Sequence, residues 1–270
     1  MFGKLATLAW YLQRPRLYPQ QLRDWQEKFV YGKAPYNHSR AEAEHWCAAR
    51  AISTDEAIQK IVGQRPGGQI TALFPEVFAA ARRQQQQVPV WMGGAGDLNL
   101  IYWLAHFSKA TRIVETGVAF GWSSLAFLLA IRERADARLV SVDMPYPKIN
   151  NDQYVGCVVP DSLRAHWSLL RYADREGLPR AIAQLGGIDL CHYDSDKRYR
   201  SRMWAYPRLW RALRPGGLLI SDDIGDNVAF RDYCQQGGVQ PTIVAIDNKY
   251  VGVLVKPDLQ EPHGAARARG

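Results

Sequence analysis

One segment predicts the architecture of this chain: Arg112-Ile-Val-Glu-Thr-Gly-Val-Ala-Phe-Gly-Trp-Ser-Ser124. The pattern predicts a buried strand, a tight glycine turn and the opening of a helix. Gly117 and Gly121 carry no side chain, so a ligand can approach the backbone closely at this turn. Glu115 stands where the strand ends. An acidic group in this position favours a ligand with positive charge over the pyrophosphate that a G-x-G-x-x-G turn binds.

S-adenosylmethionine, with its sulfonium and amino groups, is such a ligand. Glycine turns after buried strands occur throughout nucleotide-binding α/β folds, so the turn alone also allows a nicotinamide dinucleotide. Asp143 directly follows the apolar run that ends at Val142, 26 residues after Gly117. A carboxylate at the end of a second strand can accept hydrogen bonds from both ribose hydroxyls, and it suits either cofactor. Asp143 could equally be a helix cap or a loop acid.

From Arg112 onward the chain alternates between strand and helix, which is typical of a parallel sheet covered on both faces. The expected strands are residues 112–115, 139–142, 167–170, 188–193, 218–221, 242–246 and 250–255. The last two are joined by so short a loop that they should be antiparallel. The sequence therefore predicts an α/β fold with a doubly wound, mostly parallel seven-stranded sheet and an antiparallel C-terminal hairpin.

Three segments are expected along the chain. Residues 1–91 form a helical N-terminal extension, which could be a lid, an acceptor wall or a dimer surface. Residues 92–256 form the cofactor-binding domain, and residues 257–270 form a flexible tail. The run Met92-Gly-Gly-Ala-Gly96 precedes a helix capped by Asp97, and could be a hinge over the cofactor or a passive linker.

The formal net charge of +8 is unevenly distributed, because residues 1–40 hold seven Lys or Arg against two acids, a difference of +5. Trp10, Tyr11, Tyr18 and Trp25 are interleaved with these charges. Such a segment could contact an anionic lipid, an acidic glycan or a nucleic acid. The alternative is a solvated helical face whose aromatic residues pack onto the main domain.

Composition excludes several classes of protein. No window approaches the roughly 20 apolar residues that span a bilayer, and the apolar N-terminus lacks the cleavage site of a secretory signal. The four cysteines are scattered and contain no C-x-x-C pair. This argues against a zinc ribbon or a disulfide scaffold and favours a reducing cytoplasm.

Acidic residues follow two neighbouring strands of the expected sheet. One strand ends in Cys191-His-Tyr-Asp-Ser-Asp-Lys197, and the next ends in Ser221-Asp-Asp223. Both ends open into the same crevice of a parallel sheet, so Asp194, Asp222 and Asp223 should converge. Packing carboxylates this closely costs stability unless a cation neutralises their charge. Oxygen ligands suit Mg²⁺, or Mn²⁺ as a substitute. Alternatively, Asp222 and Asp223 form a solvated turn.

Lys197 lies three residues past Asp194, at the rim of this site. A desolvated lysine can act as a general base, although the nearby acids oppose any fall in its pKa, and a plain salt bridge is the alternative. His192 lies on the same strand face as Asp194 and is the weaker candidate for the base.

Several ordered motifs together resemble class I S-adenosylmethionine-dependent methyltransferases, and most closely the metal-dependent O-methyltransferases of bacterial sugars and natural products. The resemblance covers about residues 92–256. It rests on residues 115–124, 142–147, 159–167, 188–197 and 213–223.

The resemblance implies a role for several residues. Glu115, Thr116, Gly117, Gly121 and Ser123 would shape the methionine pocket. Asp143 and Met144 would bind the ribose side, and Asp174 would reach the adenine amino group. Asp194, Asp222 and Asp223 would bind the metal. Lys197 and Asp194 would carry the catalysis, and Lys197 matches the base of catechol-type relatives, where many sugar-directed relatives have histidine.

The sequence thus predicts a cytoplasmic, S-adenosylmethionine- and Mg²⁺-dependent O-methyltransferase. Its acceptor would be a small molecule or glycan with neighbouring hydroxyls. Contact with a membrane or an anionic glycan, and a homo-oligomer, are left open. The alternatives are a catechol-type phenolic O-methyltransferase, an NAD-dependent oxidoreductase, or a non-catalytic membrane- or polyanion-binding module. Nucleic acid is not an expected acceptor, because no Asn/Asp-Pro-Pro-Tyr/Phe motif is present.

Overall fold

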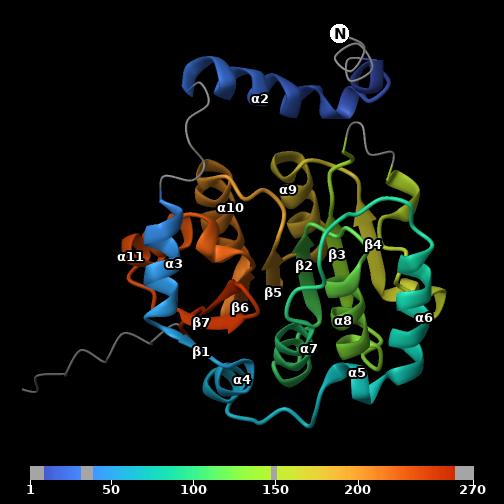
Figure 1. The fold of residues 1–270 in the computed structure, drawn as a ribbon, viewed down its shortest axis with the longest axis vertical. Coiled ribbons are helices and arrows are strands. Elements are labelled where there is room, and N and C mark those ends of the chain that lie inside the picture. Colours follow the sequence, from blue (N-terminus) through green and yellow to red (C-terminus); the bar gives the residue numbers. More distant parts are fainter. Residues whose placement is uncertain (1–8, 32–38, 147–150, 259–270) are drawn as a thin grey trace, which may run out of the picture.

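The protein, described by a computed structural model over residues 9–31, 39–146 and 151–258, is built on one mixed sheet (Figure 1). The sheet has eight strands in the order β1-β7-β8-β6-β5-β2-β3-β4. They are β1 (Ala51–Ile52), β2 (Arg112–Thr116), β3 (Arg138–Val142), β4 (Trp167–Leu170), β5 (Ile188–Tyr193), β6 (Leu213–Ser221), β7 (Thr242–Ile246) and β8 (Lys249–Val255). The expected tail, apart from residues 257 and 258, lies outside the described residues.

The predicted fold class is confirmed: only β8 runs antiparallel to its neighbours, β6 and β7. The sheet has one strand more than expected, because Ala51 and Ile52 pair in parallel with β7. A strand of two residues is too short to show any hydrophobic period, so this strand could not be predicted from the sequence. Strand β6 also begins five residues before the expected start, at Leu213.

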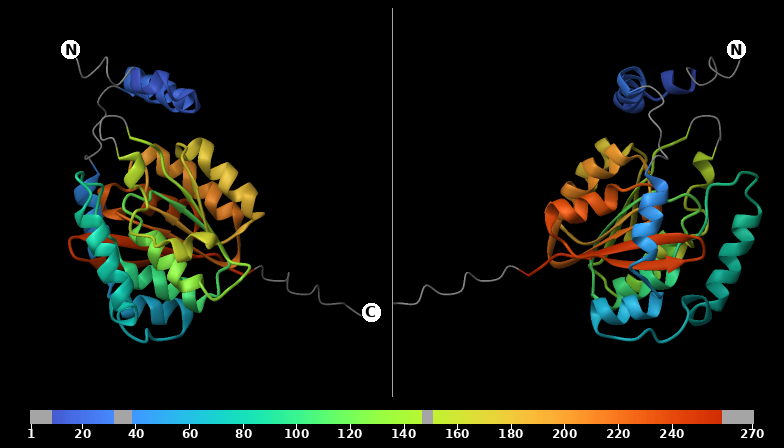
Figure 2. Two further views of the ribbon diagram at one scale, coloured as in Figure 1. Left: turned by 90° about the vertical axis from the view of Figure 1, so that its right-hand side faces the viewer. Right: turned by 60° about the vertical axis from the view of Figure 1, so that its left-hand side comes forward.

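Helices cover both faces of the sheet (Figure 2). One layer contains α4 (Thr54–Val62), α5 (Ile70–Leu73), α6 (Pro75–Gln86), α7 (Leu98–Phe107) and α8 (Trp122–Ile131). The other contains α9 (Asp174–Leu185), α10 (Tyr199–Ala212) and α11 (Ala229–Gly237), with part of α3 (Arg40–Ala48). Short 3₁₀ turns lie at Pro15–Leu17, Asp152–Tyr154, Asp161–His166 and Ile224–Asp226.

The central strands are apolar on both faces, as strands between two helical layers must be. In β2, Ile113 packs in the cluster under α7 and α8, whereas Val114 packs in the cluster under α9 and α10. The same alternation continues at Leu190 and Cys191 of β5. The next residues, Glu115 and His192, are therefore expected on the α8 side.

One N-terminal helix, α2 (Tyr18–Tyr31), lies across the end of the sheet where the parallel strands finish (Figures 1 and 2). Of the aromatic residues in this region, Tyr11 is buried, whereas Tyr18 and Trp25 are exposed. The aromatic residues therefore do not all pack onto the main domain. Among the described residues, no helix has both the length and the apolar character needed to cross a membrane.

Candidate active site

The glycine turn after β2 brings the backbone of two strands close together. Gly117 has a φ of +78°, and its N–H donates to the Val142 carbonyl at 2.9 Å. A Cβ at this position would lie 2.4 Å from the Asp194 carbonyl oxygen. Only glycine fits here, because a side chain would meet both a strained φ and a backbone clash. Strands β2 and β5 are neighbours at the point where the strand order reverses, the usual ligand crevice of such sheets.

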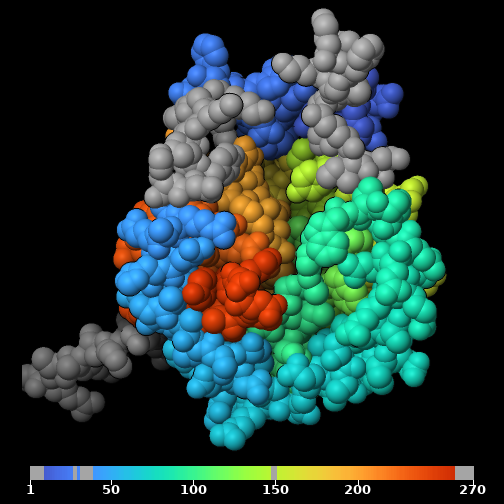
Figure 3. All heavy atoms as spheres, in the orientation of Figure 1, coloured from blue at the N-terminus to red at the C-terminus, as the bar shows by residue number. Residues whose placement is uncertain are grey.

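The larger cavity of this crevice has a volume of about 540 Å³. Gly117, Asp143, Met144 and Asp174 line its floor, and Gln20, Arg23 and Asp24 of α2 close it from above. Figure 3 shows α2 above this end of the molecule. The cavity therefore has acidic groups at the ends of two strand–helix connections and a polar helical roof.

Asp143 organises the turn after β2. Its Oδ2 accepts hydrogen bonds from the N–H groups of Val118, at 2.8 Å, and Ala119, at 3.3 Å. Its Oδ1 accepts from Arg171, which also donates to Asp152 at 2.9 Å. A ribose hydroxyl at Asp143 would therefore have to share or replace the Arg171 contact. Sequence reasoning missed Arg171, because nothing in the order of residues pairs it with Asp143.

Asp174, the first residue of α9, lies in the wall of the larger cavity. Its carboxylate accepts a short hydrogen bond from the Ser195 hydroxyl. Burial raises the pKa of Asp174 to about 6, although the hydrogen bond from Ser195 stabilises the ionised carboxylate and so opposes this rise. A carboxyl group with this pKa can accept from, or donate to, the edge of a purine ring near neutral pH.

A second, smaller cavity of about 320 Å³ continues from the first. The two share Gly117, Asp143, Tyr146, Ser195 and Lys197 in their walls. The glycine run before α7 forms another wall, and Gly96 approaches Asp222 Oδ2 closely enough that a Cβ would lie 3.6 Å away. The predicted hinge segment thus borders the cavity.

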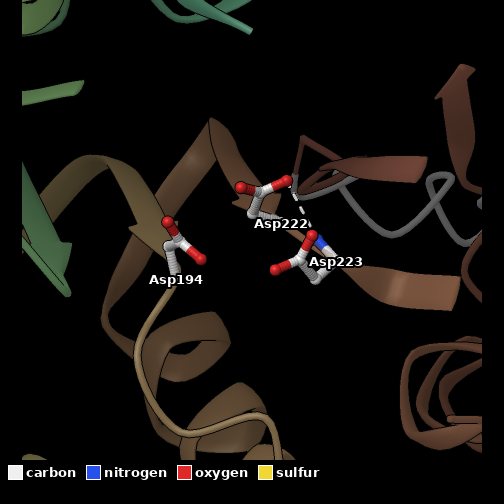
Figure 4. A group of neighbouring side chains, drawn as sticks. All are labelled: Asp194, Asp222 and Asp223. Carbon is white, nitrogen blue, oxygen red and sulfur yellow. Dashed lines mark hydrogen bonds between the residues drawn. The ribbon is translucent and has the colours of Figure 1, made fainter. Parts of the chain in front are cut away.

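The three acids of the predicted metal site converge on this smaller cavity (Figure 4). Asp194 follows β5, while Asp222 and Asp223 follow β6, and one ligand oxygen from each lies within 4.8 Å of the others. Asp222 Oδ1 accepts from the Asp223 N–H at 2.9 Å, and Asp223 has a left-handed φ of +50°. Burial, together with Asp194 and Asp223, raises the pKa of Asp222 to about 6.

Two lysines partly neutralise these acids. The Lys197 ammonium pairs with Asp194 and lies 2.7 Å from Asp223 Oδ2, and Lys249 lies 3.0 Å from Asp223 Oδ1. Burial alone would lower the pKa of Lys197, but Asp194 and Asp223 raise it well above its ordinary value. Lys197 is therefore a cation here. Lys249, at the start of β8, was missed because only the sheet order brings it to β6.

Glu115 lies behind the site rather than in a cavity wall. Its Oε2 accepts from Ser124, at 2.5 Å, and Ser141, at 2.6 Å. Its Oε1 has no partner and lies 3.9 Å from Nδ1 of His192, which also has none. Burial raises the pKa of Glu115 to about 7 and lowers that of His192 to about 4. His192 itself reaches the smaller cavity in its neutral form.

The predicted cofactor residues thus fall into two groups. Gly117, Ser123, Asp143, Met144 and Asp174 line the cavities, whereas Glu115, Thr116 and Gly121 do not. Thr116 Oγ1 lies 3.0 Å from the Ser195 hydroxyl oxygen, and a Cβ at Gly121 would lie 2.9 Å from Gly156 Cα. These three residues support the loops that form the crevice. Sequence position alone cannot separate the two groups.

Comparison with known proteins agrees with this arrangement. A family model described as a methyltransferase domain matches residues 114–224, which run from within β2 past the end of β6 and contain the three acids. No curated protein matches the chain.

Solved structures share the fold at low sequence identity. The O-methyltransferase TomG from Streptomyces achromogenes, solved with SAM and involved in tomaymycin synthesis, is 17% identical, with a TM-score of 0.51 over 82% of this chain and 97% of its own. Cofactor-bound Rv0187 from MTB is 19% identical, with a TM-score of 0.50 over 71% and 93%. A methyltransferase from Geobacter sulfurreducens is 20% identical, with a TM-score of 0.50 over 72% and 93%.

Residues 114–224 thus match a methyltransferase domain, and the chain shares the fold of the O-methyltransferase TomG, which was solved with SAM. The expected family resemblance and enzyme class are confirmed.

Proposed function

We propose that this protein transfers a methyl group from S-adenosylmethionine to a hydroxyl oxygen, on an acceptor with neighbouring hydroxyls. One observation carries the proposal: Asp194, Asp222 and Asp223 converge on a cavity that is continuous with the crevice of the methyltransferase fold. TomG, which shares the fold, is an O-methyltransferase that was solved with SAM. A carboxylate cluster beside a methyl donor suits a hydroxyl acceptor, because hydroxyls must be oriented and deprotonated to attack.

The residues present fit a divalent metal ion. Three carboxylates from two strand ends offer oxygen ligands of the type that Mg²⁺ and Mn²⁺ prefer. Lys197 pairs with Asp194 and Asp223, which supports the view that this acidic cluster needs a positive charge to balance it. When bound, the metal would supply Lewis-acid activation and orientation of the acceptor hydroxyls. Asp194, Asp222 and Asp223 would hold it.

The cofactor would lie along the crevice. Asp143, with Met144, would hold the ribose side, and Asp174 would meet the adenine edge in the larger cavity. Gly117 leaves the backbone open where the methionine part would pass into the smaller cavity. S-adenosylmethionine supplies the activated methyl group on its sulfonium, so this chain contributes orientation and electrostatics.

Lys197 and His192 are the two candidates for the group that takes the acceptor proton. Lys197 is held protonated by Asp194 and Asp223, and can act as base only once other positive charge balances these acids. His192 is neutral and borders the same cavity, which keeps it as the alternative.

Sugar, natural-product and catechol-type acceptors all fit the proposed chemistry. Trp91, Trp122 and Tyr146 line the smaller cavity, and flat aromatic faces can pack on a sugar or a phenolic ring. Of these acceptors, we favour a sugar, a glycan or a natural product. We also propose a cytoplasmic location, which is supported by the four cysteines, all of them free. Within residues 1–91, α2 would serve as a lid on the cofactor-binding domain, supported by its side chains over the larger cavity.

The proposal is tested by calorimetry and by turnover. We expect S-adenosylmethionine to bind the purified protein and NAD not to bind. A panel of sugar diols and catechols is then assayed for methyl transfer with Mg²⁺, with chelator, and in Asp222→Asn. Turnover should be abolished by chelation and fall at least about a hundredfold in Asp222→Asn.

Asp226→Asn is the matched control, because Asp226 lies on the same connection outside the three-acid cluster, 3.8 Å from Arg40. Its turnover should equal that of the wild type. Binding of NAD in place of S-adenosylmethionine would support the oxidoreductase instead, and full turnover with chelator would refute the metal-dependent reaction.

A further inference from the structure

One face of α2 is apolar and points away from the rest of the protein. Tyr18, Leu22, Trp25 and Phe29 recur at helical spacing and are 37%, 56%, 55% and 93% exposed. We refer to these four residues as the α2 stripe. Leu12 and Val30 extend the exposed apolar surface beside it, at 62% and 63%. Contiguous exposed apolar surface of this kind marks a contact site.

The opposite face of α2 is the one that holds the helix on the protein. Arg23 pairs with Glu176 at 2.7 Å, and Asp24 accepts from Arg198 at 2.8 Å. Gln20 is buried and bonds to both Arg23 and Asp24. A surface helix ordinarily buries its apolar stripe and exposes its polar face. In α2 this order is reversed, so internal packing does not explain the stripe.

Charge and composition indicate what the stripe meets. Residues 1–40 contain seven basic and two acidic residues, a net +5. Arg14, Arg23 and Arg40 pair with acids of the protein, whereas Arg16 is exposed just before α2. Aromatic side chains such as Tyr18 and Trp25 suit the boundary between headgroups and acyl chains. A helix with an aromatic and aliphatic face, flanked by basic residues, is the pattern of interfacial binding to anionic lipid.

The available area argues against a second copy of the chain as the occupant. The α2 stripe offers roughly 500 Å² of exposed surface. A stable protein–protein interface buries about 800 Å² on each partner. A lipid surface needs only the apolar face of one helix, with cationic groups nearby to meet the headgroups.

We propose that α2 binds the surface of an anionic membrane, with the α2 stripe inserted at the boundary between headgroups and acyl chains. The polar face of α2 stays on the protein through Arg23 and Asp24. Because that face also roofs the larger cavity, binding places the active-site crevice next to the lipid surface. This contact is independent of the proposed chemistry, since it needs neither cofactor nor acceptor.

The test is flotation of the full-length protein with lipid vesicles, without cofactor. Vesicles of phosphatidylcholine alone are compared with vesicles containing phosphatidylglycerol, at low and high salt. We expect binding to the anionic vesicles, weakened by high salt, and at least about tenfold weaker binding of the double variant Trp25→Ser/Phe29→Ser. Its thermal unfolding and its affinity for S-adenosylmethionine should stay close to those of the wild type.

Leu73→Ser is the matched control, because Leu73 is an exposed apolar residue, at 41%, on α5 at a distance from the stripe. It should float as the wild type does. Absence of flotation, equal flotation of the double variant, or equal binding to neutral vesicles would overturn the proposal. So would a dimer in sedimentation equilibrium that the double variant converts to a monomer, because the stripe would then join two copies.

Discussion

The ammonium group of Lys197 lies 2.7 Å from the Asp223 carboxylate, within the cluster that the metal proposal concerns. Lys197 also pairs with Asp194, so one side chain neutralises acids from two strand ends. A divalent ion and Lys197 would compete for the same oxygens.

Replacing Lys197 with Met should tighten metal binding and reduce catalysis. Removing a positive charge next to Asp194 and Asp223 should raise Mn²⁺ affinity at least about tenfold, measured by calorimetric titration of metal-free protein. If Lys197 is the base, methyl transfer falls by roughly 10²–10⁴. Lys60→Met, at an exposed lysine on α4, should change neither quantity. Retained turnover in Lys197→Met, with turnover lost in His192→Ala, would assign the base to His192.

Replacing Gly117 with Ala should destabilise the protein by about 2–4 kcal/mol. The added Cβ would combine a φ of +78° with a contact of 2.4 Å to the Asp194 carbonyl. Gly63→Ala is the control, because its φ is +72° but nothing lies within 4 Å of the added Cβ. That variant should lose only ~1 kcal/mol. Urea unfolding measures both, and equal losses would show that the close approach to Asp194 is not restrictive.

Asp189 should stabilise the fold above about pH 4, and lose this effect as the pH falls toward 2. Although burial opposes it, hydrogen bonds from the Arg112 side chain and from the N–H groups of Thr111 and Arg112 lower the pKa of Asp189 to about 2. This folded-state pKa is below the ordinary 3.8, so protonation favours unfolding. Asp189→Asn should cost about 2–3 kcal/mol at pH 7, and less at pH 2.5.

Urea unfolding at the two pH values measures the Asp189 effect. Asp161→Asn is the control, since Asp161 is fully exposed and its ion pair within the described residues is with Arg164, at 3.1 Å. It should unfold as the wild type does. If Asp189→Asn lost as much free energy of unfolding at pH 2.5 as at pH 7, the lowered pKa of Asp189 would not be what stabilises the fold.

Glu115 should make the protein less stable as the pH rises from about 4.5 to 7. Burial raises the folded-state pKa of Glu115 to about 7, so over this range the folded protein binds a proton that the unfolded chain has released. Glu115→Gln cannot titrate, and it keeps an oxygen for Ser124 and Ser141. The variant should therefore lose part of the decline in melting temperature between pH 5 and 8. An unchanged decline would show that Glu115 is ionised throughout.

The sequence predicted most of the sheet because its central strands are buried on both faces. Residues such as Ile113, Val114, Leu190 and Cys191 form continuous apolar runs between helices, and this order admits few topologies. Asp194, Asp222 and Asp223 could be placed together because parallel strands finish at one edge. Strand β1 was missed because its two residues pair only after β7 is in place.

What the sequence by itself determined is the class of fold, the location of the crevice and the convergence of its acids, since these follow from strand order and local glycine geometry. Only the tertiary structure decided which acids already have partners. Arg171 reaches Asp143, and Lys249 reaches Asp223, through contacts between residues far apart in the chain. It also decided which face of α2 meets the protein, because the polar contacts to Glu176 and Arg198 come from other helices and fix the orientation that periodicity leaves open.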